Sequence, residues 1–457
     1  MSNNSKLFQK ESEKVAFDIK HRKTIRFNMS RYNVAVSKGQ LRYSNLELAK
    51  QRASAIKEKV LQNLDMYLKQ FEENISKRGA KVIYAKNSEE AISEIISILK
   101  SNEVKLVVKS KSMTTEEIDF NKSLEENEIE SVETDLGEYI VQIAGEKPYH
   151  IVTPAMHKSK EDVDELFNEK FNTPKNSSPE YLTNWVRNKL RKKYIAADAG
   201  VTGANFLIAD IGAVALTENE GNGLMSTAFP KIHIAIAGIE KILPSYKDLD
   251  LFLPLLAVHG TGQQITAYNS IFTGPKQKGE IDGPEKMYVI LLDNGRSKLF
   301  DKNEQHKSLK CIRCGACLNA CPVYKNIGGY TYETTYSGPI GSVITPQLKN
   351  LKDYKHLSFA SSLCGKCTEV CPVKIELHKL LLYNRRESVE EGYSPITEKI
   401  GMFAYQSAML NRNILDAGGH TVKNKFSFIG KKAWGQRRQI PKLQKSFSKQ
   451  YKEKHNK

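Results

Sequence analysis

Hydrophobic residues recur at two different periods along the first third of this chain. Between residues 45 and 77 they are spaced as on one face of a helix, among many charged residues, which predicts one long amphipathic helix. Short runs rich in β-branched residues follow and alternate with helical stretches. The predicted strands are residues 81–85, 104–108 and 129–133, and the predicted helices lie near residues 89–99 and near Thr114. This alternation is typical of a parallel sheet with crossover helices.

Four runs farther along the chain are almost continuously apolar. They are residues 206–210 (FLIAD), 213–217 (AVALT), 232–239 (IHIAIAGI) and 287–293 (MYVILLD). Strands that are covered on both faces have this pattern. We therefore predict an α/β domain with a mostly parallel sheet over residues 45–299, preceded by a charged arm over residues 1–44.

Composition adds a large positive charge to a chain of ordinary globular character. The 457 residues, 40% hydrophobic and 26% charged, suit two or three domains. The formal net charge of +17 suits nucleic acid, an anionic membrane surface or an acidic protein partner. Much of this charge falls in a predicted basic tail over residues 391–457, which we interpret as a docking strip or a solvated surface. Its last segment contains Lys431, Lys432, Arg437, Arg438, Lys442, Lys445, Lys449, Lys452, Lys454 and Lys457.

The apolar segments indicate where the protein resides. The first residues, MSNNSKLFQKESEK, lack the apolar core of a signal peptide. The longest apolar runs, near residues 251–258 and 233–239, are far shorter than the ~20 residues that span a bilayer. We expect a cytoplasmic protein without a transmembrane segment. Because thiols stay reduced in that compartment, a dense group of cysteines indicates metal binding before disulfides.

All seven cysteines lie within the 61 residues from Cys311 to Cys371. The first run, CIRCGACLNACP, contains Cys311, Cys314, Cys317 and Cys321. Its spacing, C-x2-C-x2-C-x3-C-P, is that of bacterial ferredoxins, and Gly315 allows the backbone to pass close to a cluster. Zinc is the alternative, but it takes four ligands, usually as two separated C-x2-C pairs, and does not require this triplet.

The second run, SSLCGKCTEVCPVKI, repeats the first without its opening cysteine, and Ser361 stands at that position. In two-cluster ferredoxins the last cysteine of each run binds the other cluster. On that rule one cluster is held by Cys311, Cys314, Cys317 and Cys371, and the other by Cys321, Cys364 and Cys367. The second is then a four-iron cluster closed by water, Ser361 or a partner's group, or a three-iron cluster. We favour the four-iron form.

These runs predict an α-helical, two-cluster ferredoxin-type domain over residues 300–390. The 42 residues between Cys321 and Cys364 are rich in glycine and tyrosine. This insert covers a cluster, forms a docking surface or is an ordinary ordered loop, and the sequence leaves all three open.

The large domain offers fewer chemical signals. Glu218 and Glu220 stand two residues apart before the turn formers of EGNG, which suits a reactive carboxylate or a charged strand exit. His150, His157, His233 and His259 are scattered without metal-ligand spacing, so we predict surface or core histidines. No complete glycine fingerprint for flavin, nicotinamide or ATP is present in the sequence.

The segment KSKSMTTEE, residues 109–117, is predicted to open a helix. Thr114 is the predicted N-cap, and Glu117 completes a capping box three residues later. Lys109 and Lys111 beside this helix start suit an anion, although capping explains most of the pattern without a ligand.

Over nearly the whole chain these motifs resemble the lactate utilization protein B family, the iron–sulfur subunit of a three-protein L-lactate oxidation system. The resemblance rests on KSKSMTTEE, IADIGAVALTENEGNG, IHIAIAGIEKILP, CIRCGACLNACPVY, YSGPIGSVITP and LCGKCTEVCPVKI. It implies a LUD-type domain of the sugar-isomerase and CoA-transferase fold, followed by the same seven cysteines and two [4Fe-4S] clusters. It also implies two partner subunits and an electron acceptor that is a protein or the quinone pool. It assigns no role to the basic tail.

Three functional hypotheses follow. The leading one is an electron carrier in an assembly that converts L-lactate into pyruvate, with its roles in the seven cysteines. The second makes the large domain an acyl-CoA or phosphosugar enzyme, with Glu218 or Glu220 reacting and the clusters structural or regulatory. The third is a basic redox sensor on nucleic acid, which we rank last because no recognisable reading motif accompanies the tail.

Overall fold

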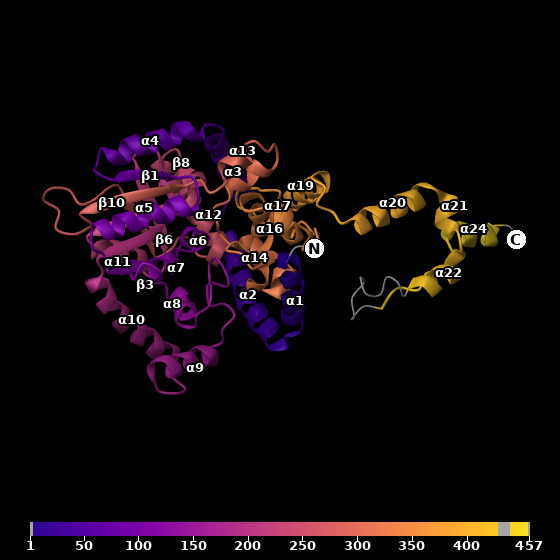
Figure 1. The fold of residues 1–457 in the computed structure, drawn as a ribbon, viewed down its shortest axis with the longest axis horizontal. Coiled ribbons are helices and arrows are strands. Elements are labelled where there is room, and N and C mark those ends of the chain that lie inside the picture. The colour runs from indigo at the N-terminus through magenta and orange to yellow at the C-terminus, as the bar shows by residue number, and fades with distance from the viewer. Residues whose placement is uncertain (1–2, 428–438, 456–457) are drawn as a thin grey trace. The chain divides into compact units, whose positions relative to one another are not determined.

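The computed structural model describes residues 3–427 and 439–455, and the chain divides into two compact units, residues 1–388 and 389–457. A six-stranded sheet organises the first unit (Figure 1). Its order is β1-β10-β7-β4-β2-β3, and every neighbouring pair is parallel, which confirms the predicted α/β fold. The strands are β1 (Lys81–Ala85), β2 (Leu106–Lys109), β3 (Glu130–Glu133), β4 (Ala199–Gly203), β7 (Ile232–Gly238) and β10 (Lys286–Leu292).

Successive side chains of β7 point to opposite faces of the sheet. Ile234 and its alternate neighbours pack in one hydrophobic cluster with helix α5 (Ser88–Ser101) and helix α7 (Phe120–Glu125). Ala235 and Ala237 pack in another cluster with helix α4 (Leu64–Ser76), across the sheet from α5. The sheet is therefore covered on both faces, as its apolar strands require.

A second sheet, of order β8-β5-β6-β9, contains two of the predicted strands. Strand β5 (Phe206–Ile208) and strand β6 (Ala213–Glu218) are antiparallel neighbours in this sheet, with Ile208 opposite Ala213. The connection between them is too short for the crossover that a parallel pair needs. Strand β6 also pairs antiparallel with β9 (Tyr268–Phe272), and β5 pairs parallel with β8 (Ile242–Leu243).

The predicted long helix over residues 45–77 is two helices. Helix α3 (Leu46–Gln62) is followed by Asn63 as its C-cap, and α4 starts at Leu64. Asn63 has φ −133° and ψ 35°, outside the helical region, and its side-chain amide donates to the carbonyl of Lys59 at 2.9 Å. This local bond competes with continuation of the helix. The apolar residues that predicted one helix therefore lie on two.

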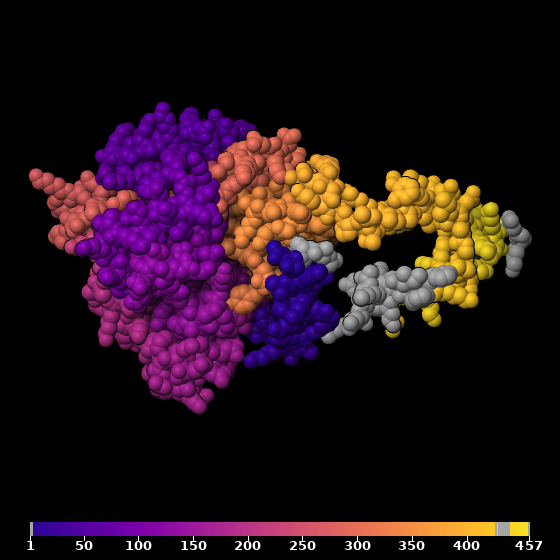
Figure 2. Space-filling model, viewed as in Figure 1, coloured from indigo at the N-terminus to yellow at the C-terminus, as the bar shows by residue number. Residues whose placement is uncertain are grey.

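The predicted charged arm is helical in the structure. Helices α1 (Asn3–Phe17) and α2 (Ile19–Gln40) bury Phe8, Ile25 and Met29 in one hydrophobic cluster with the cysteine-rich segment. Figure 2 shows this N-terminal segment, in indigo, beside the cysteine-rich segment in orange, which packs directly against the α/β region. The N-terminal residues thus form part of the first unit.

The cysteine-rich segment consists of short helices, and its insert is ordered. Tyr324, Tyr332 and Tyr336 of the insert are all 5% exposed or less, so the insert is part of the core. The helices are α14 (Ala316–Ala320), α15 (Tyr324–Ile327), α16 (Gly338–Leu348), α17 (Leu351–Phe359), α18 (Lys366–Glu369) and α19 (Leu377–Glu390), with 3₁₀ turns η3 (Gln305–Lys310) and η4 (Tyr330–Tyr332).

The other helices of the first unit cover the sheets and connect their strands. They are α6 (Met113–Glu117), α8 (Leu136–Ile143), α9 (Lys160–Phe171), α10 (Pro179–Ala196), α11 (Asn222–Ala228), α12 (Leu249–Thr261) and α13 (Ser297–Phe300), with 3₁₀ turns η1 (Ile239–Lys241) and η2 (Tyr246–Asp248). None of the helices described is both long and apolar enough to cross a membrane.

The second unit holds the predicted basic tail. Its helices are α20 (Ile396–Leu410), α21 (Arg412–Asp416), α22 (Gly419–Phe426) and α24 (Phe447–His455). Within it Lys445 pairs with Glu453. Five basic residues of the predicted tail, Lys431, Lys432, Arg437, Arg438 and Lys457, lie outside the described residues.

Candidate functional site

The two cysteine runs follow the same backbone course. Gly315 and Gly365, each directly after a cysteine, both have φ 78° and begin helices α14 and α18. The residues two positions before these glycines, Arg313 and Leu363, both have positive φ, 61° and 53°. Left-handed backbone is rare outside glycine, so its repetition at matching positions shows that the runs form two equivalent loops.

The seven thiols fall into two neighbourhoods. One cavity is lined by Cys311, Cys314, Cys317 and Cys371. The last of these comes from the second run and lies with three thiols of the first. Conversely, the thiols that act electrostatically on Cys367 are Cys321 and Cys364. Among the described residues no three His, Cys, Asp or Glu side chains are grouped closely enough to hold one metal ion.

Most of these thiols are costly to ionise without a metal. Burial and neighbouring thiols raise the pKa of Cys367 and of Cys371 to about 11. The same causes raise the pKa of Cys314 and Cys317. Iron binds the thiolate form, and its positive charge offsets this penalty.

Backbone N–H groups point at three of the sulfurs. Arg313 donates to Cys311 Sγ at 3.4 Å, Tyr324 to Cys321 Sγ at 3.5 Å, and Ile375 to Cys371 Sγ at 3.3 Å. N–H···S bonds of this kind stabilise cluster thiolates. All seven cysteines are free of disulfides, so this donor set fits iron–sulfur clusters.

Ser361 occupies the place in its loop that Cys311 occupies in the first. The Ser361 hydroxyl accepts an N–H bond from Leu363 at 3.1 Å, as Cys311 Sγ accepts one from Arg313. The serine therefore preserves the loop while replacing a good iron ligand by a poor one.

Buried cations lie around the four-thiol cavity. Lys50 is 8% exposed, donates to the carbonyl of Glu369 at 3.1 Å, and acts electrostatically on Cys371 and Cys314. Burial lowers the pKa of Lys241 to about 8, although Cys311 and Glu240 counteract it.

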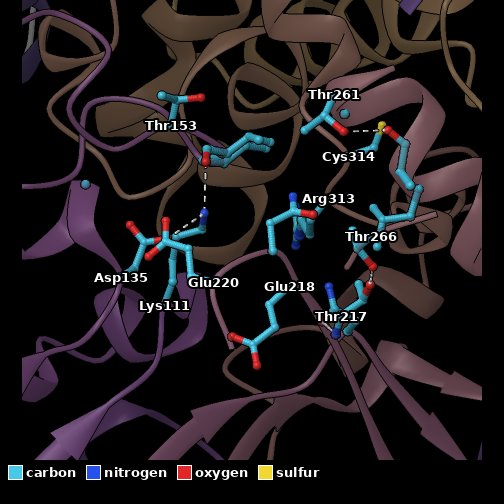
Figure 3. A pocket seen from close by; sticks show the side chains of 18 of the residues that line it. Lys111, Asp135, Thr153, Thr217, Glu218, Glu220, Thr261, Thr266, Arg313 and Cys314 are labelled. Atoms are coloured by element: carbon cyan, nitrogen blue, oxygen red, sulfur yellow. Dashed lines mark hydrogen bonds and ion pairs between the residues drawn. The ribbon is translucent and has the colours of Figure 1, made fainter. Parts of the chain in front are cut away.

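A second cavity, of about 380 Å³, adjoins the thiol cavity (Figure 3). Ile151, Arg313 and Cys314 line both cavities and form the wall between them. The pocket also contacts Ser110 and Asp135, just beyond the carboxyl ends of strands β2 and β3. Ligands of open parallel sheets bind at this end of the strands.

Acidic and basic groups face each other across this pocket. Figure 3 shows Lys111, Asp135 and Glu220 close together on one side and Arg313 on the other. Lys111 donates to the carbonyl of Val152 at 2.8 Å and lies 3.5 Å from Asp135. Desolvation within the pocket and the nearby Asp135 raise the pKa of Glu220 to about 7.

The two predicted carboxylates have different roles. Both line the pocket, but Glu218 caps helix α11 by accepting N–H bonds from Gly223 and Leu224 at 2.6 and 2.9 Å. Glu220 accepts one N–H bond, from Leu136 at 3.1 Å. Of the pair, Glu220 is the one that remains available for chemistry.

The predicted cap of helix α6 is wrong by two residues. Ser112, rather than Thr114, is the N-cap and accepts from the N–H of Thr115. The serine leaves the strand with extended φ and ψ, as an N-cap requires. Glu117 does not close a capping box, because its carboxylate is bound by Arg296 at 2.8 Å.

Lys109 is unavailable to an external anion. Its side chain is fully buried and pairs with Glu133 at 2.7 Å, Glu138 at 3.4 Å and Glu116 at 3.5 Å. The predicted anion site is therefore reduced to Lys111, which lines the pocket.

The four histidines make local structural contacts. His150 Nδ1 accepts from the N–H of Val152 at 3.1 Å, and His157 pairs with Glu146 at 2.8 Å. His233 contacts the Thr202 hydroxyl at 2.8 Å, and His259 contacts the carbonyl of Leu255 at 2.8 Å.

Sequence reasoning missed three residues of the pocket. Ser110 and Asp135 follow strand ends and Arg313 follows a cysteine, and Ser110 and Arg313 are 203 positions apart in the sequence. Only the position of Ser110 and Asp135, each two residues after a predicted strand, gave a usable signal.

Comparison with known proteins gives a consistent result. Residues 68–292 match the LUD domain family, and residues 307–375 match the 4Fe-4S dicluster domain family. Lactate utilization protein B of Bacillus subtilis is 48% identical over 363 residues, 79% of this chain and 76% of that protein. The protein of the same name from Bacillus velezensis has the same identity and coverage. That from Shouchella clausii is 41% identical over 416 residues, 91% of this chain and 87% of its own.

Proposed function

The chain belongs to the lactate utilization protein B family, and we propose that it is the iron–sulfur electron-transfer subunit of an assembly that oxidises L-lactate to pyruvate. The observation that carries this proposal is the sorting of the seven thiols into two neighbourhoods. One borders the pocket of about 380 Å³ through Cys314, and the other includes the exposed Cys364. Electrons can therefore enter beside the pocket and leave near the surface.

The chain's own residues hold two clusters in this proposal. The first set is Cys311, Cys314, Cys317 and Cys371, and the second is Cys321, Cys364 and Cys367. Cubane clusters, when bound, accept and release single electrons. The supporting observations are the shared cavity of the first set and the electrostatic neighbours of Cys367.

The surface near Cys364 is the proposed exit. Cys364 is exposed, and a Cβ added at Gly365 meets no atom within 4 Å, so this loop is open. With Ser361 in place of a cysteine, a four-iron cluster held there would have one iron without a thiolate ligand. We propose that one of two partner subunits docks at this loop and passes the electrons to an acceptor protein or to the quinone pool, in the cytoplasm.

Iron analysis of anaerobically purified protein tests the cluster content. We expect about eight irons and eight sulfides per chain, with EPR signals that appear on reduction by dithionite, because two four-iron clusters fit the seven ligands. About seven irons, with an EPR signal already present before reduction, would replace the second cluster by a three-iron form. Zinc in place of iron would refute the proposal.

Replacing Lys50 by methionine tests whether Cys371 and Cys314 belong to one cluster. Lys50→Met removes a buried positive charge beside Cys371 and Cys314, so the reduced, more negative form of the first cluster loses stabilisation. We expect an EPR-monitored redox titration to show a lower reduction potential for this cluster and an unchanged potential for the other. Lys59→Met, exposed on the same helix, is the matched control. Equal shifts in both clusters would contradict the assignment.

A further inference from the structure

Two buried polar groups in the pocket beside Cys314 have no hydrogen-bond partner. They are the hydroxyl of Ser110, whose residue is 3% exposed, and Nη1 of Arg313. Leaving such a group unsatisfied costs about 1–3 kcal/mol. Because buried polar groups are nearly always satisfied, two orphan donors in one cavity indicate a ligand with acceptor oxygens.

The guanidinium of Arg313 is held in place by its other contacts. It stacks over the ring of Tyr336 at 4.3 Å, and its Nη2 lies 3.5 Å from Glu240. Its side chain is 12% exposed. A fixed, desolvated guanidinium with a free N–H is well suited to a carboxylate, which arginine binds in planar geometry.

The opposite wall suits a second oxygen of the same ligand. Asp135 and Glu220 lie there with Lys111. Since the pKa of Glu220 is about 7, its carboxyl group can accept a hydrogen bond in one form and donate one in the other. Such a group can bind either a hydroxyl or a carbonyl oxygen.

The pocket also has the right place and size for a small ligand. It lies beyond the carboxyl ends of β2 and β3, and its volume of about 380 Å³ is within the usual range for ligand sites. Arg313 and Cys314 separate it from the four-thiol cavity. A ligand bound here would lie against a thiol of the first cluster.

We propose that this pocket binds a small 2-hydroxy- or 2-oxocarboxylate, with its carboxylate on Arg313 and Ser110 and its 2-oxygen at Asp135 and Glu220. The inference rests on the proposed function, because L-lactate and pyruvate belong to this class of compound. It adds that the substrate or product contacts this subunit, in its LUD domain.

Calorimetric titration of the anaerobically purified holoprotein tests the pocket directly. We expect L-lactate and pyruvate to bind, and propionate, which lacks the 2-oxygen, to bind at least tenfold more weakly. Ser110→Ala removes one donor to the carboxylate and should weaken L-lactate binding about tenfold. Ser93→Ala, exposed on helix α5, is the matched control and should bind as the wild type does.

A second variant protects this test against misfolding. Arg313→Gln should weaken binding more than Ser110→Ala, because it removes the charge, and iron analysis shows whether its clusters remain. No heat of binding with wild-type protein, or equal affinities for L-lactate in wild type and Ser110→Ala, would overturn the inference.

A reconstituted assembly separates this inference from the proposed function. If L-lactate reduces the clusters in the presence of the partner subunits and Ser110→Ala raises the KM for L-lactate, both stand. If Ser110→Ala leaves the KM for L-lactate unchanged and the clusters are reduced normally, the proposed ligand of the pocket is overturned and the electron-transfer role stands. Calorimetric binding without any cluster reduction by L-lactate overturns the electron-transfer role and leaves the pocket supported.

Discussion

Replacing Cys371 by serine is expected to abolish the same cluster as replacing Cys311, although the two residues are 60 positions apart in the sequence. Cys371 shares a cavity with Cys311, Cys314 and Cys317, and its Sγ accepts a hydrogen bond from the backbone N–H of Ile375. A serine hydroxyl is a far weaker iron ligand than a thiolate, so the cluster should be lost or become labile. We expect each variant to lose about four of about eight irons, together with the same reduced-state EPR signal.

Cys321→Ser is the matched comparison for this experiment. Cys321 belongs to the first run in sequence, but its electrostatic neighbour among the thiols is Cys364. Its replacement should therefore remove the other EPR signal and spare the one lost in Cys311→Ser. Loss of the same signal in the Cys321 and Cys311 variants would show that each run holds its own cluster.

The strands could be predicted from the sequence where their side chains have high strand propensity. Strand β1 begins and ends at the predicted residues, 81 and 85, because its β-branched and aromatic residues are bounded by glycine and polar residues. Strand β4 (AGVTG) lies in the middle of the sheet and was not predicted. Gly200 is required there, since a Cβ at this position would lie 1.6 Å from the carbonyl oxygen of Ser226. Close packing thus selected residues that have low strand propensity.

The candidate site likewise has one part that the sequence predicts and one part that it does not. The cysteine spacing is local chemistry, and the sequence was sufficient to propose every thiol ligand. The pocket depends on both sheets, because Ser110 and Asp135 follow strands of the six-stranded sheet and Glu220 follows β6 of the second sheet. The ferredoxin-type loop contributes Arg313. No repeating pattern in the sequence identifies such residues, so only their positions after strand ends could be used to predict them.

Long-range charge pairing was the least accessible feature, and Arg296 is its clearest case. Its side chain is 1% exposed and bonds Glu240 at 2.7 Å and Glu117 at 2.8 Å. Glu117 also accepts from Tyr336 of the insert at 2.6 Å, and Glu240 lies 3.5 Å from Arg313. One arginine thereby connects the α/β domain with the insert and with the first cluster loop.

Arg296→Met is expected to destabilise the protein by about 3–5 kcal/mol, because it leaves two buried carboxylates without their main partner. Chemical denaturation, followed by circular dichroism, measures this loss. Arg191→Met, on the exposed face of helix α10, is the control and should change stability by less than about 0.5 kcal/mol. We also expect faster loss of iron from the Arg296 variant. Glu240 is no longer held in place by Arg296, so it no longer fixes Arg313 in the first cluster loop.

The pH dependence distinguishes lost charge pairing from lost packing. Burial alone raises the pKa of Glu240, but Arg296 and Arg313 more than offset this and lower it to about 2. In the wild type the stability that comes from this depressed pKa is present above the unfolded pKa and is lost only as the pH falls towards 2. Without Arg296, burial becomes the dominant influence on Glu117 and raises its pKa. Protonation of this carboxyl group then offsets part of the lost stability over the pH range between the raised pKa and the lower unfolded pKa. The stability difference between wild type and Arg296→Met should therefore narrow over that range, whereas a constant difference would assign the effect to packing of the arginine side chain.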